Sequence, residues 1–112
     1  MRLRQVRHPL VRRDVIGILD HILETTQGDL VAAARRLDEI DDLLEAIADN
    51  PASGVRLAGR LEGWRVRHGG RGRMITVVFH PDPDARLLSI ALVAFGGRNW
   101  LEDAVDRSGV EG

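Results

Sequence analysis

Apolar residues recur every three or four positions in two runs of the first half of the chain, the spacing of an amphipathic helix. The runs comprise Val11, Val15, Ile18, Leu19, Ile22 and Leu23, and then Leu30, Ala33, Leu37, Ile40, Leu44 and Ile47. Gln27-Gly28-Asp29 between them offers a helix stop, a turn and an N-cap residue, and Pro51 ends the second run. The pattern predicts two helices, one starting at Leu10 and one ending at Asp49, that form an antiparallel hairpin.

The remaining apolar runs are short and bounded by turn residues, as expected for β-strands. Residues 2–8 form one candidate strand, and residues 63–68, 73–80 and 86–95 form three more. A glycine-rich turn and the sequence Pro81-Asp82-Pro83-Asp84 separate these last three. Three consecutive strands with such short links are predicted to pair as an antiparallel sheet.

Two further segments complete the expected fold. Residues 55–61 read as a connector or a short strand, and Asn99 can cap a short helix from Trp100 to Asp106. The nearly continuous apolar run at residues 87–94 predicts that the last strand lies inside the sheet with both faces covered.

The order β-α-α-β-β-β predicts an α+β two-layer domain, with an N-terminal strand, a helical hairpin and a three-stranded antiparallel sheet. We expect one domain over residues 1–112.

The helical hairpin and the sheet are expected to pack through their apolar faces. The side chains predicted to meet there are Val15, Ile18, Ile22, Leu37, Ile40, Leu44, Met74, Ile75, Val77, Ile90 and Leu92.

Several absences limit the class of protein. The sequence lacks an apolar run of the ~18 residues that a membrane span needs, and its N-terminus lacks a secretion signal. It has no cysteine, which excludes disulfides and thiolate chemistry. The four histidines lack the spacing of a metal site, and the acidic run 38–42 lacks that of a calcium loop. We expect a soluble cytoplasmic protein that uses no metal and no cofactor.

The formal net charge of −1 hides a strong asymmetry along the chain. Residues 14–50 carry ten acidic residues against Arg35 and Arg36, whereas residues 55–80 carry six arginines against Glu62. All 16 basic residues are arginine, and tyrosine is absent. Arginine stays protonated at any working pH, so it can hold an anion but is a poor proton acceptor. This distribution predicts a polarised surface that is suited to binding.

The predicted strand pair at residues 63–80 carries a concentration of positive charge. Side-chain alternation places Arg65 and Arg67 on one face of the first strand and His68 on the other, and Arg73 follows the glycine turn. These arginines could contact phosphates, including those of a nucleic acid, or an acidic partner protein. They could equally form a solubilising strand face, and the sequence leaves both interpretations open.

Catalysis on this strand would require a group that moves protons. Cleavage of RNA needs a general base for the 2′-hydroxyl proton, and His68 and His80 are the only plausible bases nearby. His68 shares its strand face with Trp64 and Val66, which favours a partly buried structural histidine. We therefore expect no catalytic residue on this strand.

Arg98 and Trp100 stand out near the C-terminus, just after Gly96-Gly97. An exposed tryptophan beside an arginine is typical of the energetic centre of a protein interface. Trp100 could also cover the open end of the sheet, and the two interpretations are compatible.

The ordered set of segments resembles the ParE/RelE superfamily of toxins. The resemblance rests on residues 13–22, 33–40, 44–54, 64–68, 74–79 and 91–98. They match, in order, an Asp-hydrophobic pair, a helix with Ala-x-Arg, an exit with Pro and Gly, and the strands that follow. This resemblance implies the toxin of a type II toxin–antitoxin system, which forms a hetero-oligomer with its cognate antitoxin.

The resemblance leaves two branches to separate. RelE-like members cut mRNA in the ribosome with basic residues on the sheet and, in many, a C-terminal tyrosine; ParE-like members act on DNA gyrase and lack that set. Arg65, Arg67, Arg73 and Arg98 lie at or near the basic positions, but no tyrosine follows Arg98, and the long hairpin is ParE-like. We expect a ParE-like toxin that inhibits DNA gyrase by binding, with a target-binding surface at Arg65, Arg67, Arg73, Arg98 and Trp100. The alternatives are a RelE-like ribosome-dependent endoribonuclease and a non-toxic relative that keeps only antitoxin binding.

Overall fold

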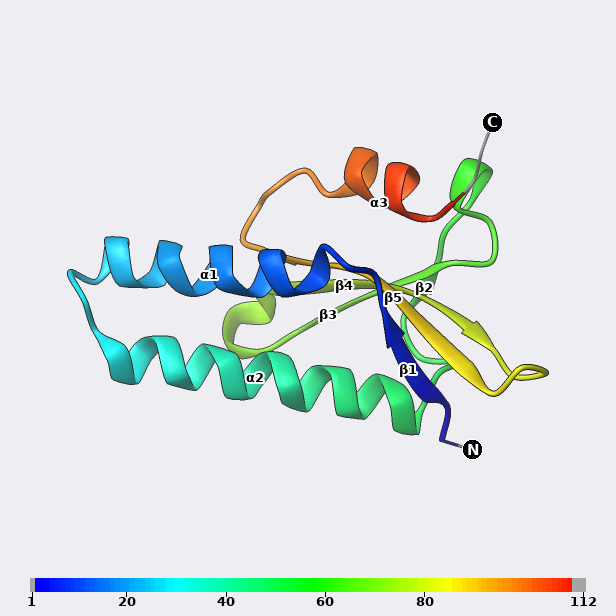
Figure 1. Cartoon of the computed structure of the whole chain (residues 1–112), viewed down its shortest axis with the longest axis horizontal. Coiled ribbons are helices and arrows are strands. Elements are labelled where there is room, and N and C mark those ends of the chain that lie inside the picture. Colours follow the sequence, from blue (N-terminus) through cyan, green and yellow to red (C-terminus); the bar gives the residue numbers. More distant parts are fainter. Residues whose placement is uncertain (1, 110–112) are drawn as a thin grey trace.

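Two helices cover one face of a five-stranded sheet, and a third, short helix packs on the other face (Figure 1). The structure, a computed structural model, describes residues 2–109. The elements are β1 Arg4–Arg7, α1 Val11–Thr25, α2 Leu30–Asp49, β2 Val55–Arg56, β3 Arg65–Gly69, β4 Ile75–Asp82, β5 Leu87–Phe95 and α3 Leu101–Arg107, with 3-10 turns at Gly59–Leu61 and Arg71–Arg73. This arrangement confirms the predicted α+β fold class.

The helical hairpin forms where the apolar periodicity predicts it. Asp29 caps α2, because its carboxylate accepts a hydrogen bond from the Ala32 amide at 3.0 Å. Gly28 turns the chain between the helices with a φ of 91°, a conformation that favours glycine. Within residues 2–109, no helix is long and apolar enough to cross a membrane.

The strand order in the sheet is β1-β5-β4-β3-β2. β1 pairs with β5 in parallel, and the other neighbours are antiparallel. The last strand, β5, therefore lies inside the sheet as predicted. The segment at residues 55–61 resolves into a two-residue edge strand and a 3-10 turn.

A bulge in β5 changes which side chains face the hairpin. Val78 lies opposite Leu92 and Phe79 opposite Ile90, so Ala91 has no partner on β4. The alternation shifts by one at that point, and Leu92 packs with the opposite cluster rather than with Ile90. The prediction that Leu92 faces the hairpin is therefore wrong, because residues 90–94 on both sides of the bulge are all apolar and leave no sign of it in the sequence.

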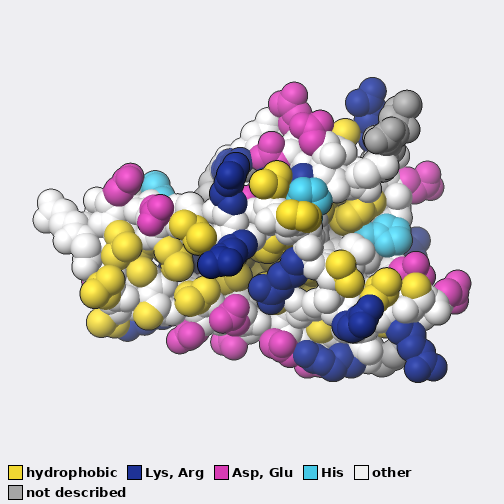
Figure 2. Space-filling view, in the orientation of Figure 1, with side chains coloured by type: hydrophobic (Ala, Val, Ile, Leu, Met, Phe, Trp, Pro, Cys, Tyr) yellow, Lys and Arg dark blue, Asp and Glu magenta, His cyan; other side chains and the backbone are white. Residues whose placement is uncertain are grey.

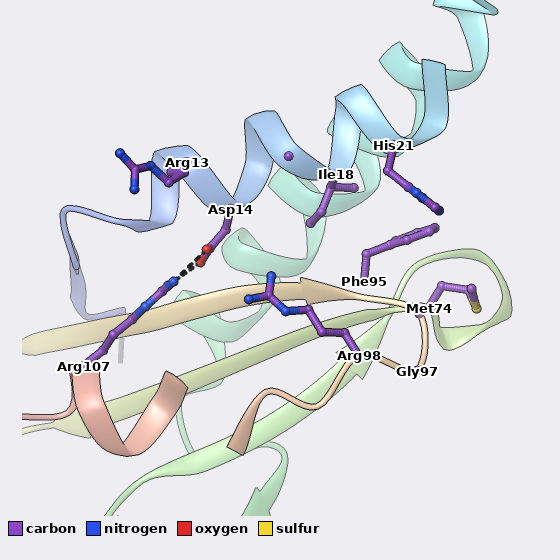
Figure 3. Close-up of a pocket in the computed structure, with 11 residues that line it drawn as sticks. Arg13, Asp14, Ile18, His21, Met74, Phe95, Gly97, Arg98 and Arg107 are labelled. Carbon is purple, nitrogen blue, oxygen red and sulfur yellow. Dashed lines mark hydrogen bonds and ion pairs between the residues drawn. The ribbon is translucent and has the colours of Figure 1, made fainter. Parts of the chain in front are cut away.

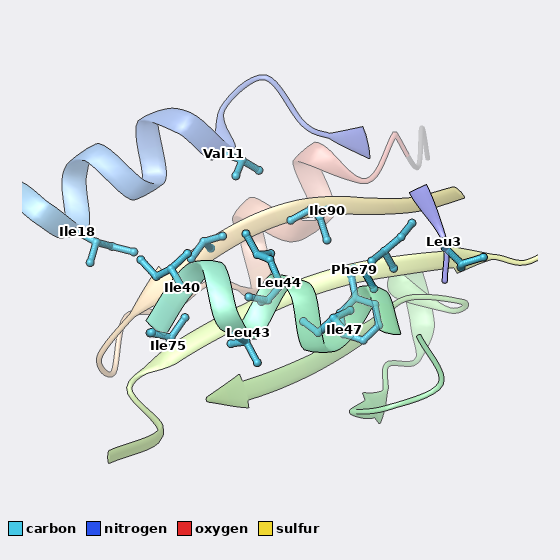
Figure 4. Packing of buried hydrophobic residues seen from close by; sticks show 14 of the residues in the cluster. Leu3, Val11, Ile18, Ile40, Leu43, Leu44, Ile47, Ile75, Phe79 and Ile90 are labelled. Carbon is cyan, nitrogen blue, oxygen red and sulfur yellow. The ribbon is translucent and has the colours of Figure 1, made fainter. Parts of the chain in front are cut away.

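The apolar interior consists of two clusters, one on each face of the sheet. Between the hairpin and the sheet, Ile40, Leu44 and Phe79 are fully buried (Figure 4). The second cluster lies under α3 and includes Leu61, Val66, Val78, Leu92, Ala94 and Ala104. Three predicted core positions are less buried than expected, since Met74 is 37% exposed and Val15 and Leu37 are only half-buried.

Replacing Leu44 by alanine should lower the free energy of unfolding by about 2–5 kcal/mol, because its side chain is 1% exposed. Leu30→Ala is the matched control, since Leu30 lies on the same helix but is 72% exposed and should cost much less. Chemical denaturation of both variants measures the difference, and equal losses would contradict the assigned helix faces.

Candidate functional site

An open cavity of about 570 Å³ lies where α1 faces the chain that follows β5 (Figure 3). Its apolar surface comes from Ile18, Met74 and Phe95. Arg13, Arg98 and Arg107 also line it, and the guanidinium group of Arg13 points away from Met74 and Phe95 (Figure 3). The cavity therefore combines apolar contact area with positive charge.

Regular geometry on α1 and a sharp turn after β5 build the two walls. Arg13, Gly17 and His21 follow one another at intervals of four, which places them along one face of the helix. The opposite wall begins at Gly96, whose φ of 70° turns the chain and whose amide donates to the Met74 carbonyl at 2.8 Å. The side chain of Arg98 then lies between the two walls (Figure 3).

A buried ion pair joins the first helix, α1, to the last helix, α3, at the edge of the cavity. Arg107 donates to both carboxylate oxygens of Asp14, at 2.5 and 2.9 Å, and the two side chains are only 10% and 6% exposed. Asp14 also accepts from the Val93 amide at 3.1 Å, and Arg107 donates to the Ala91 carbonyl at 3.3 Å. This pair therefore fastens α1 and α3 to the same strand.

The hydrogen bonds to Asp14 raise the pKa of the Arg107 guanidinium above its ordinary value. Because the pKa of Arg107 is higher in the folded state than in the unfolded state, its hydrogen bonds stabilise the fold at every pH below the unfolded-state pKa. This contribution is lost only as the pH rises through the folded-state pKa. The Arg107 guanidinium therefore keeps its charge at every pH below its ordinary pKa.

Sequence reasoning missed this ion pair, whose partners are 93 residues apart. One signal was present, because Asp14 stands within the apolar stripe of the first helix, between Val11 and Ile18. An acid in an apolar stripe indicates a buried charge that needs a partner. Nothing in the sequence identifies Arg107 among the 16 arginines as that partner.

Two of the predicted site residues, Arg65 and Arg67, hold a loop of their own chain. Arg65 donates to the Ala52 carbonyl and Arg67 to the Ser53 hydroxyl, both at 2.9 Å. Their strand register, opposite Phe79 and Val77, places them on the hairpin face of the sheet. Neither lines the cavity, so the structure gives this pair a structural role and does not bring it together with Arg98.

The other predicted residues lie closer to the cavity. Arg73 is exposed and directly precedes Met74, which lines it. Arg98 lines the cavity itself and forms an exposed ion pair with Asp103 at 2.7 Å. Trp100 is half-buried against the cluster under α3, so it covers the end of the sheet as one of its two interpretations predicts.

The two histidines considered as bases are elsewhere in the fold. His68 Nδ1 lies 2.8 Å from the Thr76 hydroxyl, and the residue is exposed rather than partly buried as predicted. His80 packs against Trp64, with ring centres 5.2 Å apart. The histidine at the cavity is His21, whose ring lies 6.1 Å from that of Phe95. Across residues 2–109 there is no group of three or more acidic or histidine side chains that could hold a metal ion.

The turn between β3 and β4 is fixed to α2 beside the cavity. Glu39 accepts from Arg36 at 2.8 Å and from the Arg71 amide at 2.9 Å, while Arg36 donates to the Arg71 carbonyl at 3.0 Å. The Arg36 guanidinium also lies over the Phe95 ring, 5.0 Å from its centre. Arginine side chains gather along the middle of this face, between the apolar tip of the hairpin and α3 (Figure 2).

Comparison with solved structures finds a similar fold in a chain of the toxin–antitoxin complex RelBE2 from Mycobacterium tuberculosis. The TM-score is 0.58, the sequence identity is 14%, and the match covers 85% of this chain and 99% of the other. This chain therefore shares its fold with a chain of that toxin–antitoxin complex, in agreement with the fold that the resemblance implied. No protein-family model matches the sequence, and no curated protein does.

Breaking the Asp14–Arg107 pair should destabilise the fold strongly. We expect Arg107→Ala to lower the free energy of unfolding by about 3–5 kcal/mol, because it leaves the Asp14 carboxylate buried without its cation. Arg98→Ala is the matched control, since it breaks an exposed ion pair and should cost less than about 1 kcal/mol. Urea denaturation tests both, and a small loss for Arg107→Ala would show that α3 is not held through this pair.

Proposed function

We propose that this protein is the toxin subunit of a type II toxin–antitoxin system and that it inhibits DNA gyrase by binding to it in the cytoplasm. Two findings support this proposal: the RelE/ParE-type toxin fold, and a cavity that offers apolar surface and arginines. Buried apolar surface beside arginine is typical of the energetic centre of a protein interface. A cognate antitoxin is the second partner in this proposal.

The chemistry of the cavity supports binding over RNA cleavage. Its arginines cannot take a proton from a 2′-hydroxyl group. The carboxylate of Asp14 is occupied by Arg107 and by the Val93 amide. His21 is the remaining group around the described cavity that could act as a base. The open cavity that combines apolar surface with the side chain of Arg98 is the observation that carries the proposal.

Replacing Arg98 should weaken gyrase inhibition. We expect Arg98→Asn to raise the concentration for half-inhibition of supercoiling about 10- to 100-fold, because hydrogen bonds to charged groups contribute about 1.5–3 kcal/mol. The control is Arg86→Asn, which removes an exposed arginine before β5, at the other end of the strand. Arg86 has a φ of 57°, and asparagine tolerates this conformation.

His21 is the observation that favours the alternative, a RelE-like endoribonuclease. It lines the same cavity as Arg13 and Arg98, which could stabilise a charged phosphate during cleavage. The discriminating assay is translation with purified ribosomes, with mRNA ends mapped by primer extension. Cuts that disappear in His21→Gln, without any gyrase inhibition by the unmodified protein, would contradict our proposal and establish the alternative. Antitoxin binding with neither activity would identify a non-toxic relative.

A further inference from the structure

The helical hairpin carries a row of side chains along each helix that the rest of the chain does not cover. We call the two rows together the hairpin strip; it consists of Arg12, Ile16, Leu19 and Leu23 on α1 and of Leu30, Ala34, Leu37 and Asp41 on α2. Both rows have the spacing of one helix face. Ile16 is 48% exposed and Leu30 is 72% exposed, and apolar side chains gather over the hairpin near its tip (Figure 2). Contiguous exposed apolar surface of this kind indicates an interaction site.

One end of the hairpin strip is charged. Arg12 and Asp41 both line an open groove of about 410 Å³, together with Ile16 and Leu37. Both charged side chains are exposed, and neither forms a hydrogen bond or an ion pair within residues 2–109. The strip therefore offers one unpaired positive charge on α1 and one unpaired negative charge on α2.

The two rows match each other level by level, because α1 and α2 run antiparallel (Figure 1). From the charged end to the tip, the levels are Arg12 beside Asp41, Ile16 beside Leu37, Leu19 beside Ala34, and Leu23 beside Leu30. A two-fold axis parallel to the helices would place α1 of one copy on α2 of a second copy at the same level. Each Arg12 would then face Asp41 of the other copy, and each apolar level would face an apolar level.

We propose that two copies of this chain associate through the hairpin strip, about a two-fold axis parallel to α1 and α2. The interface contains the Arg12–Asp41 pair twice, with the apolar side chains of both hairpins between the pairs and the tip. This inference goes beyond the proposed function, because it concerns a different face of the molecule and requires neither gyrase nor an antitoxin.

The charges favour a second copy over a helix of another protein as the occupant. The strip carries both signs of charge at one level, and an identical strip supplies both complements as well as the same apolar width. Other acids of α2 are already used within the chain, since Glu45 and Asp49 both pair with Arg2. The Asp41 carboxylate and the Arg12 guanidinium stay available for a partner.

Charge reversal tests the pairing between copies. Arg12→Asp and Asp41→Arg each place like charges opposite each other twice, so each should raise the dissociation constant of the dimer at least about tenfold. Sedimentation equilibrium of the purified full-length chain over a range of concentrations measures this constant. An equimolar mixture of the two variants should recover the dimer, because opposite charges then meet at both positions.

The apolar part of the interface has its own variant and control. Ile16→Glu places a charge at the centre of the strip and should also weaken the dimer at least about tenfold. Leu101→Glu is the matched control, since Leu101 is 52% exposed on α3 and lies outside the strip, so the dimer should be unchanged. The melting temperature of each variant shows that the fold is kept.

Three results would overturn the dimer. The first is an unmodified chain that stays monomeric up to its solubility limit. The second is a folded Ile16→Glu variant that dimerises normally, or a mixture of the charge variants that associates no better than either alone. The third is a monomeric chain whose Ile16→Glu variant loses binding to the protein encoded by the adjacent reading frame, which would reassign the strip to the antitoxin. Failure of gyrase inhibition would contradict the proposed function and leave this interface unaffected.

Discussion

The Asp14–Arg107 ion pair supplies hydrogen-bond partners to the part of β5 that extends beyond the end of β1. β1 ends at Arg7, opposite Ile90, whereas β5 continues to Phe95. Beyond Ile90, the Val93 amide donates to Asp14 and the Ala91 carbonyl accepts from Arg107. Buried backbone groups need partners, and two charged side chains supply them here in place of a strand. The positions of α1 and α3 both depend on this arrangement.

The same ion pair shapes the candidate site. Asp14 and Arg107 both line the cavity, and α3 follows directly on the segment that carries Arg98. A ligand that binds Arg98 therefore contacts a wall that is fixed to α1 through Arg107. Stability and binding are coupled at this point, so variants of Arg107 cannot separate the two. Substitutions at Arg98 or Gly17, which lie outside the ion pair, can separate them.

The sequence predicts the features of this fold that depend on neighbouring residues, and it does not predict those that depend on contacts between distant residues. The periodicity of the hairpin and the cap at Asp29 are local, and the structure confirms both. The misplacement of Leu92 follows from a bulge at Ala91, which the apolar residues on both sides of it do not reveal. The Asp14–Arg107 pair joins distant parts of the chain, so only the acid within the apolar stripe could have been noticed. The expected importance of Arg98 still awaits a measurement.

Arginine content alone is a poor guide to the binding surface of this protein. The guanidinium group has five donors in a rigid plane, so it can hold backbone carbonyls as readily as an anionic partner. Arg36 and Arg65 use donors on carbonyls of their own chain, and Arg107 uses them on a buried carboxylate and a carbonyl. Arg98 differs because its ion pair with Asp103 is exposed and its side chain lines an open cavity. Of the residues predicted to bind the target, Arg98 therefore lines an open cavity, whereas Arg65 and Arg67 donate hydrogen bonds to a loop of their own chain.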